Sequence, residues 1–401
     1  MNPDLDRLQP YPFERLARLK DGVQPPDTLS HINLSIGEPR HQPPEFVAEE
    51  MYAQRQDLGK YPVTRGSIEL RTSIVKWLSK RFQLPTGSLD ANQHILPVTG
   101  TREALFAIAQ CLINPGKDSI VAMPNPFYQI YEGACLLAGA QPFFINSDLT
   151  KKDIDLFNSI SDSVWDQCQL LYICSPGNPT GQVLSLECLQ RLIRLAHQHD
   201  FIIASDECYS EIYPDENNPP SGLLTASQTM GNKNFSRCLV FHSLSKRSNL
   251  PGLRSGFVAG DAEVMQVFHL YRTYQGCAMS LATQKASTLT WQDEGHVKKN
   301  RDQYREKFTA VIKILSAAID VNAPNAGFYL WLKTPIDDEI FCQQLFEQQH
   351  VTVVPGSYLS RNTASGNPGK NYIRIALVAG IDECIEAAHR IRDYIIKNTR
   401  L

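Results

Sequence analysis

The sequence lacks the features that mark several classes of protein. No apolar stretch reaches the ~20 residues that a membrane-spanning helix needs, and no apolar segment follows a basic start, as it does in a secretory signal. The net charge of −3 gives no electrostatic case for binding nucleic acid or an anionic membrane. The 10 cysteines are scattered, without a C-x-x-C pair or a cysteine–histidine cluster, so we predict neither a disulfide scaffold nor a metal site. We expect a cytoplasmic protein, in a compartment that keeps cysteines reduced.

The chain has the composition of a soluble globular protein with room for two domains: 401 residues, 42% apolar and 20% charged. Between residues 94 and 260, short apolar segments typical of buried strands alternate with helical stretches, which predicts parallel βαβ units. A long polar helix and then two-residue alternation follow after about residue 290, which indicates a smaller α+β domain. We expect an N-terminal arm with part of the small domain (1–45, irregular over 1–30), a large domain (46–285) and a small C-terminal domain (286–401).

Polar side chains follow four of the expected strands, at the point where each strand ends. Ligands of an open parallel sheet bind beyond the carboxyl ends of its strands, so these side chains should meet at one rim. They comprise a glycine–hydroxyl turn that opens a helix, an amide, a carboxylate with a nearby phenol, and a serine-flanked lysine followed by an arginine. In chain order they are Gly100, Thr101, Arg102, Asn178, Asp206, Tyr209, Ser243, Ser245, Lys246 and Arg254.

Each of these residues also has an ordinary explanation. A lone lysine such as Lys246 is most often a solvated surface residue, and Asp206 after a strand could be a helix N-cap. Asn178 before a proline is usually a turn residue, and Arg254 could be a surface charge. Their joint occurrence at successive strand ends favours one binding site over separate coincidences.

The motifs at these positions resemble those of the fold-type I pyridoxal-phosphate enzymes, specifically the class I/II aminotransferases. S-L-S-K at 243–246 is followed by P-G-L-R-S-G at 251–256, with N-P-T-G at 178–181 and S-D-E-C-Y at 205–209 upstream. The resemblance covers nearly the whole chain, from Ser35 to Arg374. It implies a mostly parallel seven-stranded sheet between helices, a smaller α+β domain and pyridoxal 5′-phosphate as the cofactor. It also implies the transfer of an amino group between an amino acid and a 2-oxo acid.

The resemblance assigns roles around the cofactor ring. Lys246 would hold the cofactor as a Schiff base and then move the substrate proton, and Asp206 would pair with the pyridinium nitrogen, since a carboxylate ordinarily stays ionised. Tyr209 and Asn178 would hydrogen-bond the cofactor's O3′ atom. Tyr128 would stack on the ring, although Phe127 beside it could be confused with it. Lys246, Asp206 and Tyr209 are therefore the expected catalytic residues.

The expected phosphate site lies at a helix N-terminus, where backbone N–H groups and the helix dipole favour an anion. Its expected residues are Gly100, Thr101, Arg102, Ser243, Ser245 and Arg254. Lys246 must be partly neutral to react, and we expect burial and nearby positive charge to lower its pKa. Arg254 and Arg247 are the candidate sources of that charge.

Three further residues match the family's substrate and subunit contacts. Arg374 falls where the family clamps the substrate α-carboxylate, a task that suits its planar guanidinium, and Gly37 is expected to contact the substrate. Tyr61 matches a tyrosine that reaches the cofactor phosphate of the partner subunit. The resemblance therefore implies a homodimer with shared active sites.

Within the family, residues 245–261, the opening segment and S-I-G-E-P-R-H at 35–41 look like the bacterial succinyldiaminopimelate aminotransferases of lysine biosynthesis. This implies N-succinyl-L,L-2,6-diaminopimelate as the amino donor and 2-oxoglutarate as the acceptor. Such a donor has carboxylates at both ends, so a second cationic contact is expected. Arg40, Arg65 and Arg272 are candidates.

Several alternatives to this prediction stay open or are disfavoured. Aspartate or an aromatic amino acid could be the donor, and a β-eliminating lyase could use the same cofactor residues. The Ser-x-x-Lys of 243–246 also occurs in penicillin-binding enzymes, but their S-D-N and K-T-G motifs are absent. No nucleotide-binding glycine motif is present, and an interaction module would not need the polar rim. A transcription regulator of this type would carry a DNA-binding domain before residue 35.

Overall fold

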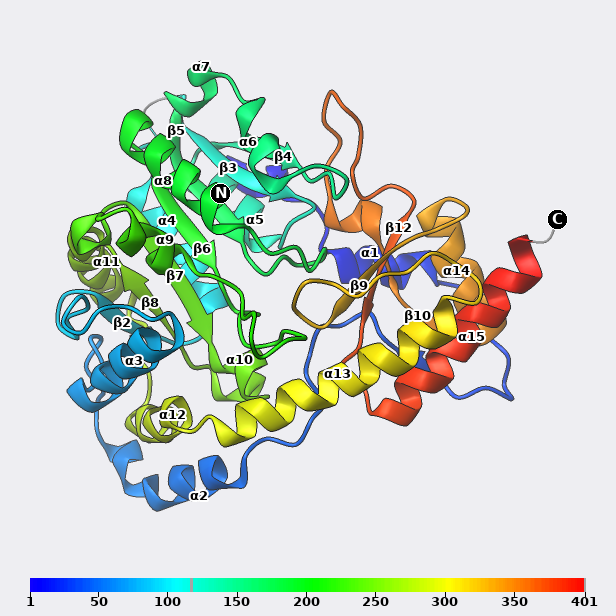
Figure 1. Cartoon of the computed structure of the whole chain (residues 1–401), viewed down its shortest axis with the longest axis horizontal. Helices are drawn as coiled ribbons and strands as arrows, with labels where there is room; N and C mark the ends of the chain where they lie inside the picture. The colour runs from blue at the N-terminus through cyan, green and yellow to red at the C-terminus, as the bar shows by residue number, and fades with distance from the viewer. Residues whose placement is uncertain (116–117, 400–401) are drawn as a thin grey trace.

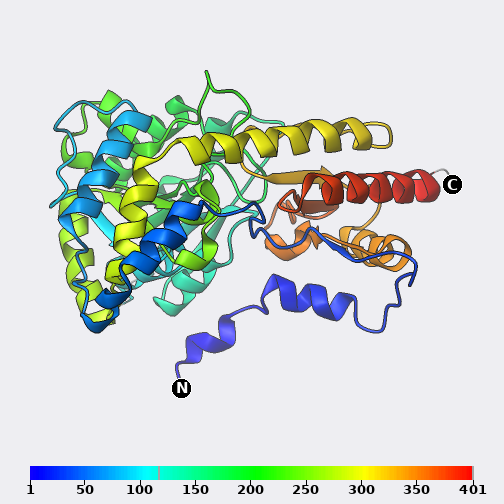
Figure 2. The ribbon, with the colours of Figure 1, turned by 90° about the horizontal axis from the view of Figure 1, so that it is seen from below.

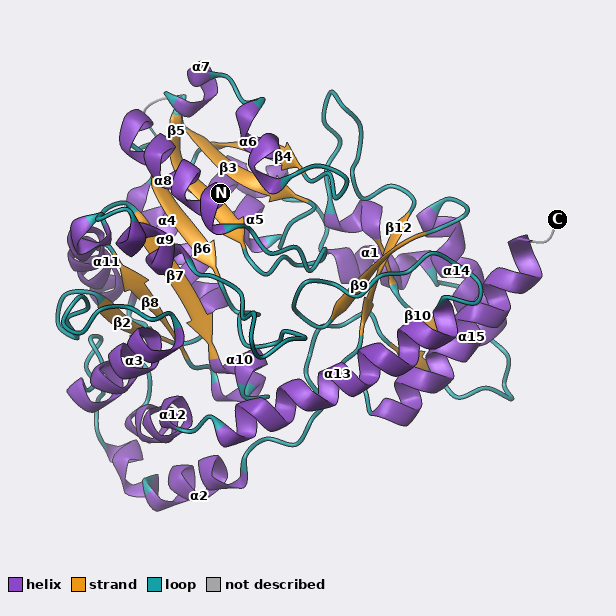
Figure 3. Ribbon diagram, viewed as in Figure 1, coloured by secondary structure: helices purple, strands orange, loops and turns teal. Residues whose placement is uncertain are grey.

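A seven-stranded sheet forms the centre of the larger part of the molecule (Figures 1 and 3). The computed structural model describes residues 1–115 and 118–399 and gives the strand order β2-β8-β7-β6-β5-β3-β4. The pairs from β7 to β4 are parallel, whereas β8 runs antiparallel to both β7 and β2. The predicted mostly parallel sheet is confirmed. Its strands are β2 (Ile95–Val98), β3 (Ile120–Asn125), β4 (Gln141–Asn146), β5 (Cys168–Cys174), β6 (Ile202–Asp206), β7 (Cys238–Ser243) and β8 (Gly256–Gly260).

Helices cover both faces of this sheet. On β7, Val240 packs into one apolar core, while Leu239 and Phe241 pack into the other. Since neither face of a strand meets water, the strands are nearly continuous apolar runs rather than alternating ones. One core includes α3 (Ile68–Arg81), α8 (Leu186–His199), α9 (Leu223–Thr229) and α12 (Leu281–Gln292); the other includes α4 (Thr101–Leu112), α5 (Ile130–Leu137) and α11 (Ala262–Gln275).

The smaller part has its own apolar core beneath an antiparallel sheet of order β11-β12-β9. A parallel pair of short strands, β1 and β10, lies beside it. Figure 2 shows α13 and α15 side by side along this part, in agreement with their contacts. The elements are β1 (Ile32–Asn33), β9 (Tyr329–Lys333), β10 (Val351–Thr352), β11 (Val354–Pro355), β12 (Tyr372–Ala376), α13 (Gly295–Leu315), α14 (Asp338–Gln349) and α15 (Ile381–Thr399).

Besides the N-terminal arm, which contacts both α5 and the smaller part, two segments join the two parts among the described residues. The connecting segment, residues 34–44, leads from β1 to α2 (Glu45–Ala53). The long helix α13 starts beside α12 and reaches the smaller part next to α15 (Figure 1). Both connections therefore pass close to the boundary where a site between the two parts would form.

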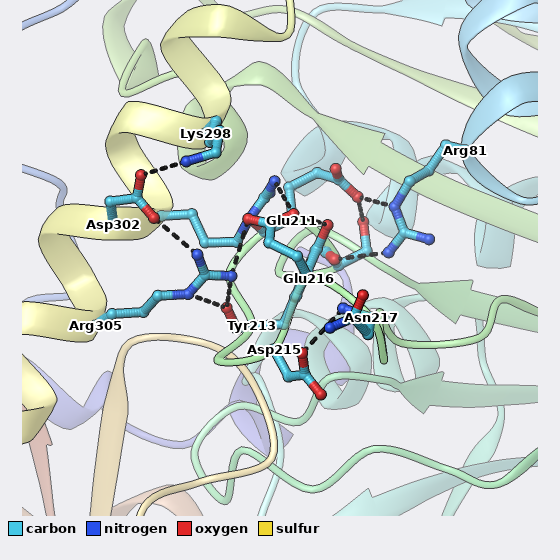
Figure 4. A network of polar contacts seen from close by, with 11 residues as sticks. Arg81, Glu211, Tyr213, Asp215, Glu216, Asn217, Lys298, Asp302 and Arg305 are labelled. Carbon is cyan, nitrogen blue, oxygen red and sulfur yellow. Dashed lines mark hydrogen bonds and ion pairs between the residues drawn. The ribbon is translucent and has the colours of Figure 1, made fainter.

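A cluster of ion pairs fixes α13 to the loop that follows β6 (Figure 4). Arg81 Nε lies 2.7 Å from Glu211 Oε1; the Glu211 side chain is buried and that of Arg81 is 11% exposed. From α13, Arg301 Nε lies 2.8 Å from Glu216 Oε1, and its Nη1 donates to the carbonyl of Glu211 at 2.9 Å. Burial would raise the pKa of Glu211, but Arg81, Arg247 and Arg301 lower it below 4.5. We call Arg81, Glu211, Arg301, Glu216 and Arg305 the paired network.

The expectation that residues 1–30 are irregular is only partly right. They contain a 3-10 helix, Pro3–Arg7, and the helix α1, Pro12–Leu19. Proline is well suited to the first position of a helix, where its missing N–H costs no hydrogen bond. Leu16 then packs against Val354, Tyr358 and Leu359 of the smaller part. Tertiary packing supports a helix that its composition alone does not indicate.

The edge strand β4 was not expected from the sequence. Its second residue is Pro142, which cannot donate to a strand ladder and is tolerated because β4 pairs only with β3.

Among the described residues, no helix combines the length and apolar character that crossing a membrane requires.

Candidate active site

A cavity of about 540 Å³ lies between the carboxyl ends of the large sheet's strands and residues of the smaller part. Of the predicted catalytic, cofactor-binding and substrate-binding residues, all line it except Gly100, Tyr61 and the three arginines proposed for a second carboxylate. The predicted residues that line it are Gly37, Thr101, Arg102, Tyr128, Asn178, Asp206, Tyr209, Ser243, Ser245, Lys246, Arg254 and Arg374. The structure thus brings side chains from five strand ends and the connecting segment to one place.

Lys246 reaches the cavity from α10 (Leu244–Arg247), a single turn directly after β7. Ser243 caps this turn, because its Oγ accepts a hydrogen bond from the backbone N–H of Ser245 at 3.1 Å. At the other end of the side chain, Lys246 Nζ donates to the carbonyl oxygen of Gly37 in the connecting segment. The capped turn therefore fixes the backbone of Lys246, and the carbonyl of Gly37 fixes the position of its amine.

Burial lowers the pKa of Lys246 from 10.5 to about 8, and Arg374 acts in the same direction. Three groups oppose this shift: Cys208, Glu38 and Asp206. The expectation that Arg254 or Arg247 supplies the positive charge is wrong, since Arg374 does so. Arg247 points into the core, where it stacks near Trp291 and pairs with Glu294 at 2.6 Å.

Hydroxyl, guanidinium and backbone N–H groups gather where α4 begins. Gly100 precedes the helix with a φ of +93°, and a Cβ at this position would overlap the guanidinium of Arg254. Glycine alone permits this close approach. Ser243 Oγ and Ser245 Oγ lie 3.0 Å apart on the same side of the cavity. Together with the free N–H groups of a helix N-terminus, this corner offers a site for an oxyanion.

Asp206 ends β6 and is 4% exposed. Its Oδ2 accepts a hydrogen bond from Tyr131 Oη at 2.7 Å, and its Oδ1 accepts one from the backbone N–H of Cys208 at 3.2 Å. Burial raises the pKa of Asp206 above 3.8, although hydrogen bonds from Cys208 and Tyr131 oppose this. Burial and hydrogen bonding thus act on this pKa in opposite directions. A cationic group in the cavity would stabilise the ionised form.

The structure distinguishes Tyr128 from Phe127. Tyr128 lines the cavity, with its ring edge-on to Tyr131. Phe127 is 1% exposed and stacks on Phe144 in the core. Tyr128 is the aromatic side chain available to a planar ligand.

Arg374 on β12 is buried and has no carboxylate partner among the described residues. Its Nη1 donates to Asn178 Oδ1 at 2.9 Å, and its Nη2 donates to the carbonyl of Ser35 at 2.7 Å. Its Nε has no hydrogen-bond partner. A buried guanidinium with an unused donor beside a cavity is suited to an anionic ligand.

Two tyrosines form the wall beside Arg374. Tyr209 Oη lies 3.1 Å from Tyr329 Oη, and the guanidinium of Arg374 stacks over the Tyr329 ring at 4.5 Å. A Cβ at Gly37 would overlap the Tyr329 hydroxyl, so glycine is required here by packing. The sequence analysis missed Tyr329, and also Tyr131, because both lie within ordinary apolar periodicity. Only their hydrogen bonds in the fold identify them.

Besides Gly100, four of the predicted cofactor and substrate residues lie outside the cavity that this chain forms. The side chain of Tyr61 is fully exposed. Arg40 pairs with Glu383 at 3.3 Å, and Arg65 donates to the carbonyl of Asn92 at 2.5 Å. Arg272 is buried and pairs with Glu103 at 2.6 Å. In this chain, therefore, none of the three arginines proposed for a second carboxylate faces the cavity.

Comparisons with known proteins agree with this geometry. The family profile described as "Aminotransferase class I and II" matches residues 30–391. A curated relative, the LL-diaminopimelate aminotransferase of Maridesulfovibrio salexigens, is 30% identical over 96% of this chain and 97% of its own. The enzyme of the same name from Aquifex aeolicus is 29% identical over 96% and 97%.

Solved structures show the same architecture. An aminotransferase from Neisseria meningitidis superposes with a TM-score of 0.94 at 47% identity, over 98% of this chain and 100% of that one. The aminotransferase AspB from Helicobacter pylori gives a TM-score of 0.88 at 34% identity, over 98% and 99%. With its strand-end cavity, its buried lysine and a family profile that spans most of its length, the chain belongs to the class I and II aminotransferases, which are pyridoxal-phosphate-dependent enzymes.

Proposed function

We propose that this aminotransferase moves an amino group from N-succinyl-L,L-2,6-diaminopimelate to 2-oxoglutarate, with Lys246 as the residue that holds the cofactor. The observation that carries the proposal is the arrangement of the cavity: Lys246 Nζ, the carboxylate of Asp206 and the guanidinium of Arg374 face one space. Each of these groups meets one requirement of the reaction: a reactive amine, a partner for a ring nitrogen and a clamp for a carboxylate.

The residues present fit pyridoxal phosphate. The oxyanion corner at Gly100, Thr101 and Arg254 would hold the phosphate, with Ser243 and Ser245 beside it. Asp206 would hold the ring nitrogen, and Tyr128 would pack against the ring face. Asn178 and Tyr209 would hydrogen-bond the ring oxygen. When bound, the cofactor supplies an electron-withdrawing ring that stabilises negative charge at the substrate's Cα.

Lys246 would act as the base of the reaction. With a pKa of about 8, the amine of Lys246 is neutral in a useful fraction of molecules near neutral pH. Neutral Nζ can take the proton from the donor's Cα, and the protonated amine can later give that proton back to the substrate. The carbonyl of Gly37 orients Nζ, and the burial that lowers the pKa also keeps water from the amine.

The charges that line the cavity favour a substrate with carboxylates at both ends. Arg374 would clamp the α-carboxylate, and Arg254 and Lys246 serve the cofactor. Arg102, which lies over the Tyr11 ring at 5.6 Å, is then the remaining cation on the lining. We propose that Arg102, rather than Arg40, Arg65 or Arg272, contacts the distal carboxylate.

The same lining supports the acylated donor over free LL-diaminopimelate. Asp206 is the only carboxylate among the described residues that line the cavity, and it lies at the cofactor position. The distal ammonium of free diaminopimelate would need an anion, whereas succinylation makes that nitrogen a neutral amide and adds a carboxylate. The relatives' name, LL-diaminopimelate aminotransferase, favours the free compound and makes it the second candidate.

We also propose that the enzyme is a homodimer in which Tyr61 reaches the partner's cofactor phosphate. Large apolar side chains are more than half exposed around Tyr61 in sequence and on α11, a feature that often marks a subunit interface. They are Tyr52, Leu58, Val63, Val267, Leu270 and Tyr274.

A half-reaction screen tests the donor. The enzyme with bound pyridoxal phosphate is mixed with one amino donor at a time, and the decay of the cofactor's visible absorbance is followed. We expect the fastest decay with succinyldiaminopimelate. We expect Arg102→Met to slow that donor up to about fivefold but not alanine, since an exposed charged contact is worth about 1 kcal/mol at most. Faster decay with free LL-diaminopimelate, aspartate or an aromatic donor would replace the proposed substrate. Release of ammonia and pyruvate would indicate a lyase.

A further inference from the structure

Three polar side chains, of which two are buried and His41 is half-buried, form a chain of hydrogen bonds outside the cavity, next to α10. Lys307 on α13 lies 2.5 Å from Nε2 of His41, which belongs to the connecting segment. Nδ1 of His41 lies 2.6 Å from Oδ1 of Asn300, about two helical turns before Lys307 on the same face of α13. Lys307 is 2% exposed and Asn300 is 4% exposed. We call these three residues the relay.

The hydrogen bonds fix the direction of the relay. Burial lowers the pKa of His41 to about 4, with Lys307 acting in the same direction and Asn300 opposing, so the imidazole is neutral. Because Lys307 can only donate, Nε2 of His41 must accept, and its proton must then lie on Nδ1. Nδ1–H donates to Asn300 Oδ1, which turns the amide NH₂ of Asn300 away from His41.

The relay ends on the turn that carries Lys246. Asn300 Nδ2 donates to the backbone carbonyls of both Lys246 and Arg247, at 3.2 Å each. The last carbonyls of a helix have no partner within it, and α10 is only one turn long. Asn300 therefore stabilises the C-terminal end of this turn from outside.

The relay also holds the connecting segment against the cavity. Ser35 and Gly37 in this segment accept hydrogen bonds from Arg374 and from Lys246 Nζ. His41 is the segment's contact with α13, and Lys307 also donates to the carbonyl of Leu377 at 3.3 Å. Both connections between the two parts of the molecule thus meet at Lys307, His41 and Asn300.

A buried lysine such as Lys307 is an unusual choice for a residue whose only task is to stabilise the fold. It has no carboxylate within ion-pair distance among the described residues, and burial lowers its pKa from 10.5 to about 8. A buried lysine without a carboxylate partner costs folding free energy, and methionine would fill the same space without that cost.

We propose that the relay consists of positioning residues: Lys307, His41 and Asn300. They hold the turn that bears Lys246 in place against the segment that bears Gly37, and in this way they keep water away from Lys246. This inference deepens the proposed function, because it concerns how the chain prepares the same lysine. None of the three residues lines the cavity. They act through the backbone of α10 and the connecting segment.

The proposal predicts the direction in which the properties of Lys246 change. The ionisable groups around Lys246 are Cys208 and Asp206 after β6, Glu38 in the connecting segment and Arg374 on β12; those around Lys307 are His41, Glu383 and Cys384. If the relay is broken, α10 and residues 35–41 loosen and water reaches Nζ. The pKa linked to Lys246 should then rise toward its ordinary value.

Four variants test the relay. His41→Leu and Lys307→Met break it, whereas His41→Gln keeps an acceptor for Lys307 and a donor for Asn300. Lys313→Met removes an exposed lysine from the same helix as the matched control. Two measurements are made on each, both on the cofactor-free chain: the pH midpoint for the reaction of Lys246 Nζ with an amine-specific reagent, and amide hydrogen exchange of residues 244–250. Urea unfolding is recorded alongside.

We expect His41→Leu and Lys307→Met to raise the pH midpoint by about 0.5 or more and to speed exchange at residues 244–250, while His41→Gln and Lys313→Met stay near wild type. A change in urea unfolding alone, with midpoint and exchange unchanged, would overturn the relay. A wild-type enzyme without any visible absorbance in the presence of pyridoxal phosphate would instead contradict the proposed role of Lys246, and both measurements on the cofactor-free chain would still decide whether the relay holds the turn.

Discussion

The molecule holds two groups of cations, one in the paired network and one around the cavity, that differ in their partners. In the paired network behind the cavity, Arg81 and Arg301 each meet a carboxylate within 2.8 Å. In the cavity, Lys246, Arg254 and Arg374 have no carboxylate within ion-pair distance among the described residues. They donate instead to backbone carbonyls and to the amide oxygen of Asn178.

The difference separates charges that hold the structure from charges kept for a ligand. A paired cation has already recovered the free energy lost on leaving water, so removing its partner destabilises the fold. An unpaired cation beside a cavity has not recovered that free energy. An anionic ligand that binds in the cavity can supply the missing favourable interaction. The two groups should therefore respond to substitution in opposite ways.

The largest expected effect is in the paired network. Glu211→Gln should lower the free energy of unfolding at pH 7 by roughly 3 kcal/mol or more, because Arg81 stays largely buried without its carboxylate. Since the pKa of Glu211 is lowered in the fold, its contribution is complete above about 4.5 and is lost as the pH falls below that value. The difference between variant and wild type should shrink accordingly in acid.

Urea denaturation measures this difference. Asp302→Asn, which removes a half-exposed carboxylate at the edge of the same cluster, should cost less than about 1 kcal/mol and serves as the control. Equal losses in the two variants would mean that burial does not distinguish the pairs.

In the cavity, Lys246→Met should stabilise the cofactor-free chain by about 1–3 kcal/mol near neutral pH, because an amine with a lowered pKa opposes folding. Between about 8 and 10.5 the unfolded chain binds more protons at this lysine than the folded chain. Wild-type stability should therefore rise with pH across that window, and the variant should lack that rise. Lys298→Met, at an exposed site, should change neither quantity; a destabilised Lys246→Met would place Lys246 among the structural charges.

A smaller effect is expected for Arg374→Lys. Lysine cannot bind a carboxylate through two parallel hydrogen bonds, so KM should rise about tenfold for the amino donor and for 2-oxoglutarate, with stability nearly unchanged. Steady-state kinetics with each substrate varied in turn would show this. A rise for one substrate alone would contradict the assignment of Arg374 to the shared α-carboxylate.

The sequence predicted the large sheet and the cavity residues at its strand ends for one physical reason, whereas Gly37, Tyr128 and Arg374 were predicted from the family resemblance. Buried parallel strands are short apolar runs, and whatever follows each run must lie at the same edge of the sheet. Asn178, Asp206 and Lys246 could therefore be grouped before any coordinates existed. The boundaries near residues 45 and 285 stay a prediction.

Contacts between distant segments could not be predicted in the same way. The charge that lowers the pKa of Lys246 comes from Arg374, 128 positions later, because the smaller part folds back over the strand ends. Arg247, adjacent to Lys246 in sequence, points into the core. Likewise, nothing in the pattern around His41 indicates that Lys307 and Asn300 lie against it. Helix α1 is supported by packing on Leu359 rather than by its own composition.

The most direct test of the account is to find which lysine holds pyridoxal phosphate. The enzyme with bound cofactor is reduced with borohydride, digested and analysed by mass spectrometry, with Lys246→Ala treated in parallel. We predict the cofactor's mass on the peptide that contains Lys246, and neither that mass nor amino-group transfer in the variant. Cofactor fixed to another lysine, or a Lys246→Ala enzyme that transfers amino groups at the wild-type rate, would contradict the account.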